Sequence, residues 1–138
     1  MPKKKNSKSI LIVEDEAIIA EMYSNALTQQ AYQVLIAKTQ EQAMQMFEQA
    51  LPWMILLDLL LPQEGQLEPD YSGEPVGLTL LRKIRQHPQG KASKIIVVTN
   101  LAEDIHRQKA LDLGADLYFI KAQLDPHDLI KKVDGLSK

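Results

Sequence analysis

The sequence predicts an α/β protein built on a doubly wound, five-stranded parallel sheet. Short apolar runs alternate with amphipathic helical patterns, and the runs are continuous enough for strands that are buried on both faces. The chain has 138 residues, of which 45% are hydrophobic and none is cysteine. This size favours one domain whose core needs neither disulfides nor a structural metal.

The predicted elements follow one another in strict alternation. The expected strands are residues 10–13, 32–37, 54–57, 94–99 and 117–120. Apolar residues at helical spacing predict one helix after each strand. These helices are expected at residues 18–30, 40–51, 78–86, 101–113 and from 126 onward.

Polar residues and a glycine mark the ends of two of these helices. Thr39 with Gln42 three residues later is a capping-box pattern for the second helix. Asn100 with Glu103 three residues later is expected to cap the fourth helix, and Gly114 is expected to stop it.

Two segments lie outside this regular pattern. Residues 1–8 form a basic tail with four lysines and no acid, and removing those charges from the net charge of −2 leaves the rest of the chain at −6. The tail carries no aromatic residue for base stacking, so we expect a disordered, solvated segment rather than a nucleic-acid contact. Residues 63–76 form an extended loop, which is either a solvated insertion or a contact for a partner protein. Residues 9–138 are assigned to the one folded domain.

Composition excludes some classes of protein. The longest apolar stretch, residues 53–61, is interrupted by Asp58, so it is too short and too polar to cross a membrane or to serve as a signal-peptide core. The absence of cysteine excludes a thiolate nucleophile and a cysteine zinc site, and it favours a cytoplasmic location.

Polar residues stand at the carboxyl ends of four predicted strands: Glu14, Asp15, Asp58, Thr99 and Lys121. Doubly wound sheets bind their ligands at this edge. Clustered carboxylates repel one another, and a divalent cation with oxygen ligands, Mg²⁺ above all, is the simplest neutraliser. The ammonium group of Lys121 and the hydroxyl of Thr99 would bind a second anion. This set suits phosphoryl transfer onto a carboxylate, with Asp58 as the nucleophile.

Four motifs follow one another along the chain: Ile10-Leu11-Ile12-Val13-Glu14-Asp15-Glu16, Leu56-Leu57-Asp58-Leu59-Leu60-Leu61-Pro62, Val97-Val98-Thr99 and Gly114-Ala115-Asp116-Leu117-Tyr118-Phe119-Ile120-Lys121. In this order they resemble the receiver domain of two-component response regulators. The resemblance covers nearly the whole chain. It implies a flavodoxin-like (βα)5 fold with strand order 2-1-3-4-5, and a stand-alone domain similar to a chemotaxis regulator.

The resemblance also implies a role for each site residue. Asp58 would accept a phosphoryl group, and Mg²⁺ would be held by Glu14, Asp15, Asp58 and the backbone carbonyl of Leu60. Thr99 and Lys121 would bind the phosphoryl oxygens. Tyr118 would be the switch aromatic, whose rotation is coupled to the Thr99 hydroxyl; a half-buried structural tyrosine is the alternative.

The expected function is that of a phosphorylation-operated switch rather than a turnover enzyme, although such a domain catalyses its own phosphorylation and a slow dephosphorylation. The donor would be a histidine kinase or a histidine phosphotransfer protein, and the output would go to a downstream target protein or a homodimer. The surface that the target or the second copy binds would comprise the fourth helix, fifth strand and fifth helix. We expect no direct contact with nucleic acid or membrane.

Three positions depart from the common receiver pattern. Glu14 replaces the more frequent aspartate, Asn100 replaces a smaller residue, and Ala122 replaces a proline that commonly follows a cis peptide bond. The sequence therefore leaves open whether the Lys121–Ala122 peptide bond is cis or trans. Two other functions also stay open: a receiver-like binding module that is not phosphorylated, and an Mg²⁺-dependent aspartyl phosphohydrolase. Leu60 disfavours the phosphohydrolase because haloacid-dehalogenase-like enzymes place a second aspartate there.

Overall fold

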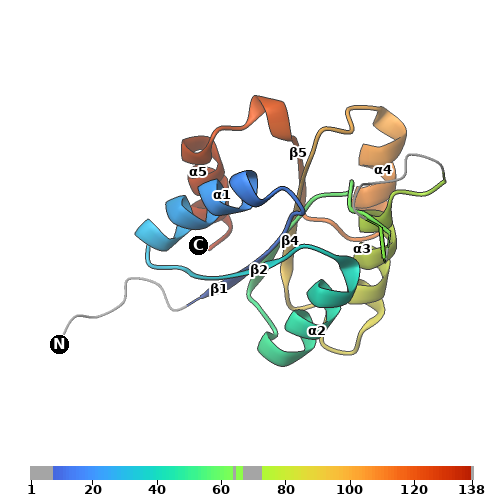
Figure 1. The fold of residues 1–138 in the computed structure, drawn as a ribbon, viewed down its shortest axis with the longest axis horizontal. Coiled ribbons are helices and arrows are strands. Elements are labelled where there is room, and N and C mark those ends of the chain that lie inside the picture. The colour runs from blue at the N-terminus through green and yellow to red at the C-terminus, as the bar shows by residue number, and fades with distance from the viewer. Residues whose placement is uncertain (1–7, 64, 67–72, 138) are drawn as a thin grey trace.

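A computed structural model of the chain describes residues 8–63, 65–66 and 73–137. Its five strands form one parallel sheet in the order β2-β1-β3-β4-β5. Helices α1 and α5 cover one face, and α2, α3 and α4 cover the other (Figure 1). This is the flavodoxin-like order that the family resemblance implies.

The elements alternate as expected. The strands are β1 (Ser9–Val13), β2 (Gln33–Ala37), β3 (Met54–Leu57), β4 (Lys94–Thr99) and β5 (Leu117–Ile120). The helices are α1 (Ala17–Gln29), α2 (Gln40–Ala50), α3 (Val76–Gln86), α4 (Asp104–Asp112) and α5 (Pro126–Leu136), with a 3₁₀ turn at Lys121–Gln123.

The central strands are buried on both faces, which explains their continuous apolar sequence. Along β3, Met54 and Leu56 belong to the core beneath α1 and α5, whereas Ile55 and Leu57 belong to the larger core beneath the other three helices. All four residues are at most 2% exposed. Successive side chains on a strand point to opposite faces, so a strand between two helical layers needs apolar residues at every position.

Six of the ten predicted strands and helices begin or end one to three residues away from the prediction, including the second strand and the fourth helix. The second strand begins at Gln33 rather than at Tyr32, because the backbone N–H of Tyr32 donates to the carbonyl of Leu27 at the end of α1. The Tyr32 hydroxyl donates to Asp134 Oδ1 of α5 at 2.6 Å, and its ring stacks on Trp53. Helix α4 begins at Asp104, and its N-cap is Glu103 rather than Asn100. By contrast, the predicted cap of α2 is confirmed, since Thr39 Oγ1 accepts from the backbone N–H of Gln42.

The two irregular segments are described in part. Residues 1–7 of the basic tail lie outside the described residues; the backbone carbonyl of Lys8 accepts from Gln33, and its ammonium lies 5.2 Å from the Trp53 ring centre. Residues 64 and 67–72 of the extended loop also lie outside. At the far end of that loop, Glu74 accepts hydrogen bonds from Arg82 at 3.0 Å and from Lys109 of α4 at 3.5 Å.

The amino-terminal edge of the sheet is held by one arginine. The Arg85 guanidinium donates to the carbonyls of Gly114 at 2.7 Å, Gly90 at 2.6 Å and Ser93 at 2.7 Å. Its Nη2 also lies 3.2 Å from Asp116 Oδ2, which in turn accepts from the backbone N–H of Ile95. These bonds join the end of α3 to the segments that lead into β4 and β5, far from the carboxyl edge.

Candidate functional site

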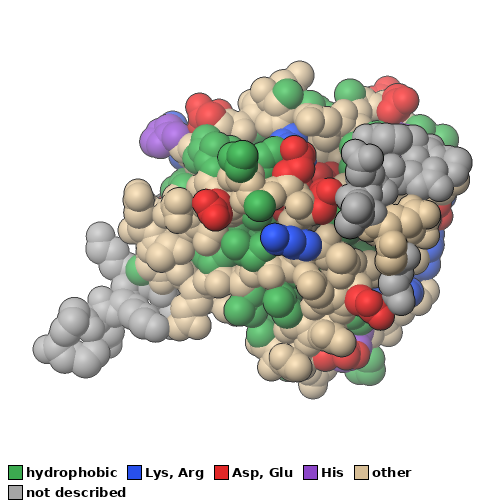
Figure 2. Space-filling view, viewed as in Figure 1, with side chains coloured by type: hydrophobic (Ala, Val, Ile, Leu, Met, Phe, Trp, Pro, Cys, Tyr) green, Lys and Arg blue, Asp and Glu red, His purple; other side chains and the backbone are tan. Residues whose placement is uncertain are grey.

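The carboxyl ends of β1 and β3 bring three acidic side chains together. Val13 and Leu57 are paired as the last residues of these neighbouring strands, so Glu14, Asp15 and Asp58 emerge at the same point of the edge. One carboxylate oxygen from each residue lies within 4.8 Å of the other two. Figure 2 shows acidic side chains gathered on the visible face between α1 and the α3–α4 side.

Lys121 completes this cluster from the end of β5. Its Nζ lies 2.6 Å from Asp58 Oδ2 and 2.7 Å from Glu14 Oε1, and its side chain is only 8% exposed. Glu16 lies farther away, with Oε1 at 3.6 Å from the same nitrogen. The single ammonium group therefore bridges the carboxylates of two different strands.

Burial and neighbouring charges shift the pKa of several of these groups. Burial, reinforced by the negative charge of Asp58, raises the pKa of Glu14 to about 7. Burial and Asp58 also raise the pKa of Asp15. At Lys121, burial opposes the charged form, but the attraction of Asp58 and the hydrogen bonds to Asp58 and Glu14 outweigh it and raise the pKa. The ammonium therefore stays charged at neutral pH.

Backbone groups hold the carboxylates in place. The N–H of Leu60 donates to Asp58 Oδ1 at 2.9 Å, and the N–H of Glu16 donates to Glu14 Oε2 at 3.1 Å. Sequence reasoning selected Leu60 for its carbonyl and missed both of these N–H donors. The signal for the Asp58 bond is local, because an aspartate in a turn commonly accepts from the N–H two residues later.

Helix α3 begins directly against the acceptor loop. The N–H of Gly77 donates to the carbonyl of Leu59 at 3.0 Å. A Cβ at residue 77 would lie 2.6 Å from the carbonyl oxygen of Asp58, and it would also collide with Leu59 Cα. Only glycine allows this approach, so Gly77 is a residue of the site that the sequence analysis did not identify.

Thr99 and Tyr118 lie on one face of the sheet near the cluster. Thr99 is 0% exposed, and its Oγ1 has no hydrogen-bond partner among the described residues. Tyr118 is 4% exposed; its hydroxyl donates to the carbonyl of Leu101 at 2.7 Å, and Arg107 of α4 lies 5.1 Å from the ring centre. Burial raises the pKa of Tyr118 to about 12, so the hydroxyl stays protonated and able to donate.

Asn100 and Ala122, the two unusual residues beside Thr99 and Lys121, contact each other. The backbone N–H of Ala122 donates to Asn100 Oδ1 at 2.9 Å. The Lys121–Ala122 peptide bond is trans, as are all the peptide bonds in the described part of the chain. The Asn100 side chain thus binds the loop after β5, which explains why it does not cap α4.

The acidic cluster fits a divalent cation. Its donors are all oxygen, two of the three carboxylates are buried, and they converge from two loops. Hard cations such as Mg²⁺ prefer this donor set, whereas softer metals prefer histidine or cysteine ligands. The predicted metal residues Glu14, Asp15 and Asp58 are brought together, and Lys121 and Thr99 lie at the same edge.

Comparisons with known proteins agree with this fold. The model of the response regulator receiver domain family matches residues 10–134. The chain is 32% identical over 129 residues to the phosphate regulon transcriptional regulatory protein PhoB of Pseudomonas aeruginosa, covering 94% of this chain and 51% of that protein. It is 32% identical over 133 residues to the transcriptional regulatory protein BaeR of Escherichia coli, covering 96% and 49%. The chain thus spans about half the length of these curated relatives.

Solved structures show the same architecture. A CheY-like response regulator receiver domain protein from Methanospirillum hungatei is 30% identical with a TM-score of 0.78, covering 94% of this chain and 93% of that one. The chemotaxis response regulator CheY4 of Vibrio cholerae, at 22% identity, has the same fold with a TM-score of 0.78, covering 94% and 98%. In the described residues, no helix has the length and apolar character needed to span a membrane. The chain belongs to the response regulator receiver domain family.

Proposed function

We propose that the chain accepts a phosphoryl group on Asp58 from a phosphohistidine donor, with Mg²⁺, and thereby switches a protein-binding surface. The observation that carries this proposal is the position of Lys121 Nζ, 2.6 Å from Asp58 and 2.7 Å from Glu14. A buried ammonium group beside a carboxylate nucleophile offers a positive charge to an incoming anion. Phosphoryl transfer depends mainly on such positioning and charge neutralisation.

The metal would be held by the carboxylates of Glu14, Asp15 and Asp58 and by the backbone carbonyl of Leu60. When bound, Mg²⁺ would neutralise the negative charge of the acceptor and of the phosphoryl group. The longer side chain of Glu14 keeps the charge that an aspartate would supply, and its Oε1 already lies within the cluster.

The chain's own residues would perform the transfer. An oxygen of Asp58 forms a bond to phosphorus while the bond between phosphorus and the donor's imidazole nitrogen breaks, and the leaving imidazole takes a proton from solvent. Lys121, whose pKa is raised, pairs with one phosphoryl oxygen. The Thr99 hydroxyl, which has no partner among the described residues, donates to another.

The switch would run from Thr99 through the segment after β4 to α4. Tyr118 donates to Leu101 in this segment and also packs against Arg107 of α4. When the Thr99 hydroxyl moves to the phosphoryl group, the residues that follow it would move too. Tyr118 would then rotate and change the surface formed by α4, β5 and α5. The phosphoryl charge thus selects one of two arrangements of this region.

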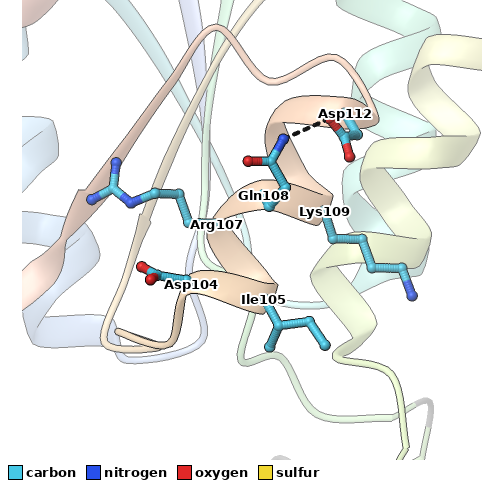
Figure 3. A pocket seen from close by; sticks show the side chains of 6 residues that line it. All are labelled: Asp104, Ile105, Arg107, Gln108, Lys109 and Asp112. Carbon is cyan, nitrogen blue, oxygen red and sulfur yellow. Dashed lines mark hydrogen bonds between the residues drawn. The ribbon is translucent and has the colours of Figure 1, made fainter.

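Helix α4 offers the output surface. Ala110 is its only buried residue, and Ile105 is 71% exposed. A hollow of about 590 Å³ lies along this helix. In Figure 3, Ile105 and Lys109 point to the side of α3 while Arg107 points away from it, and Gln108 bonds to Asp112 at 2.8 Å. We assign this surface to a downstream target protein or a second copy of the chain.

Phosphorylation is tested with acetyl phosphate and Mg²⁺, followed by mass spectrometry. The wild type should gain the mass of one phosphoryl group, and Asp58→Ala should abolish the gain. Asp112→Ala, on the exposed side of α4, is the control and should be labelled like the wild type. No labelling of the wild type would favour the binding-module alternative, and repeated turnover of small phosphate esters would favour the phosphohydrolase.

The output surface is tested by sedimentation with and without beryllofluoride. If a second copy binds, beryllofluoride should shift the protein toward a dimer, and Ile105→Glu should prevent the shift. Ile18→Glu, at an isoleucine of α1 that is 83% exposed, is the matched control. A protein that stays monomeric with beryllofluoride bound would direct the proposal to a different partner protein.

A further inference from the structure

A side chain joins the two loops that carry Thr99 and Lys121. Asn100 directly follows Thr99 at the end of β4, and Ala122 directly follows Lys121 at the start of the 3₁₀ turn. The N–H of Ala122 donates to Asn100 Oδ1 at 2.9 Å. Because Thr99 pairs with Ile120 as the last residue of the β4–β5 ladder, this bond continues the pairing beyond the end of the sheet.

This bond depends on the identity of both residues. A proline at residue 122 would have no N–H to donate, and an alanine at residue 100 would have no side-chain oxygen to accept. The two residues that stand out in the sequence are therefore partners in one contact.

The bond holds the backbone next to the charged cluster. Lys121 reaches Asp58 and Glu14 from a short 3₁₀ turn, at whose end the Leu124 N–H donates to the Lys121 carbonyl at 3.2 Å. On the other side, residues 100–103 precede α4 and form no helical turn of their own. The contact between Asn100 and Ala122 joins these two segments directly beside Thr99 and Lys121.

We propose that Asn100 is a positioning residue for phosphoryl transfer, which acts by accepting the Ala122 N–H and thereby keeping Thr99 and Lys121 at the spacing that a phosphoryl group requires. The inference rests on the proposed function of these two residues. It predicts that the bond matters for binding of the phosphoryl group and not for binding of the metal. The metal ligands Glu14, Asp15 and Asp58 leave β1 and β3 instead.

The test compares two equilibria by calorimetry in the full chain: binding of Mg²⁺ alone, and binding of beryllofluoride, a phosphoryl mimic, at saturating Mg²⁺. Asn100→Ala and Ala122→Pro should each weaken beryllofluoride binding about five-fold, the equivalent of one net hydrogen bond. Affinity for Mg²⁺ should equal that of the wild type. Because both changes remove the same bond, the double variant should bind beryllofluoride no more weakly than the weaker single variant.

Ala122→Ser is the matched control because it retains the N–H, so it should bind beryllofluoride like the wild type. Asn100→Ala changes no backbone and keeps the test decisive if Ala122→Pro fails to fold. Wild-type affinity for beryllofluoride in Asn100→Ala, or an equal loss of Mg²⁺ affinity, would overturn the inference. A wild type that binds no beryllofluoride and accepts no phosphoryl group would instead overturn the proposed function.

Discussion

Replacing Lys121 with methionine removes the positive charge of the site but keeps a side chain of similar length. In the wild type, Nζ lies 2.6 Å from Asp58 and 2.7 Å from Glu14, and the lysine side chain is 8% exposed. The variant would leave three carboxylates with oxygens within 4.8 Å of one another and no cation among them. We expect Lys121→Met to destabilise the metal-free protein strongly.

Two estimates give a consistent magnitude. Two carboxylates about 4 to 5 Å apart repel each other by about 3 to 4 kcal/mol at an effective dielectric constant of about 20. Removing one partner of a buried ion pair typically costs about 3 to 5 kcal/mol. Protonation of Glu14, whose pKa is already about 7, relieves part of this cost. The free energy of unfolding should therefore fall by about 3 kcal/mol at pH 8.

The assay is urea unfolding at pH 8, first in EDTA and then in excess Mg²⁺. Mg²⁺ should stabilise Lys121→Met more than the wild type, because in the wild type the ammonium competes for the same oxygens. Saturation to about 100 times the dissociation constant contributes about 2.7 kcal/mol, so Mg²⁺ should restore most of the loss. Lys131→Met, at an exposed lysine of α5, is the control and should change stability by less than about 0.5 kcal/mol.

The reasoning fails if Lys121→Met in EDTA is as stable as the Lys131→Met control. It also fails if Mg²⁺ stabilises the wild type and Lys121→Met equally. The first result would mean that the carboxylates do not need the lysine for neutralisation. The second would mean that the lysine and the metal do not share ligands.

Three further predictions concern stability. The pKa of Glu14 is about 7 in the folded protein, so its carboxyl ionises at lower pH in the unfolded chain than in the folded one. The free energy of unfolding of the metal-free protein should therefore fall by up to about 3 kcal/mol between pH 4.5 and 7. In urea unfolding, Glu14→Gln should make the midpoint depend less on pH over this range. Gly77→Ala should lower the free energy of unfolding in urea by about 1 to 3 kcal/mol, because the added Cβ collides with backbone atoms. Gly135→Ala in α5, where the added Cβ has open space, should leave stability unchanged or raise it. Equal effects of the two changes would contradict the close approach at Gly77. Arg85→Met should lower the free energy of unfolding by at least about 3 kcal/mol and leave beryllofluoride affinity unchanged. Arg82→Met, at an ion pair whose side chains are 35% and 29% exposed, should lower it by less than about 1 kcal/mol. Similar losses for the two variants would refute the role of Arg85 at the amino-terminal edge.

The fold was predictable because its signal is repeated along the chain. Each of β1, β3 and β4 is a continuous apolar run, and only a sheet covered on both faces satisfies such strands. The acidic pair, Asp58 and Lys121 were predictable for a related reason. They are polar residues that directly follow apolar runs, and the topology of a parallel sheet brings such residues to one edge.

Other parts of the site depend on contacts between segments that the sequence does not place. The carboxamide of Asn100 looks like a helix cap in the sequence, but in the folded chain it accepts from the N–H of Ala122, and the N-cap of α4 is Glu103. Gly77 looks like an unfavourable residue near a helix start. The need for glycine becomes clear only in the folded chain, where the backbone of Leu59 lies too close to residue 77 for a Cβ. Local patterns cannot show either contact, because each joins residues from different elements.

The close approach of α3 to the acceptor loop also bears on how such proteins diverge. The bond from the Gly77 N–H to the Leu59 carbonyl brings the two ends of the extended loop together beside Asp58. A loop whose ends are already joined can change in length at little free-energy cost, since closure entropy grows only with the logarithm of length. The segment between Pro62 and Pro75 is therefore a place where evolution, or an engineer, can insert new sequence while the chemistry of the neighbouring aspartate is left undisturbed.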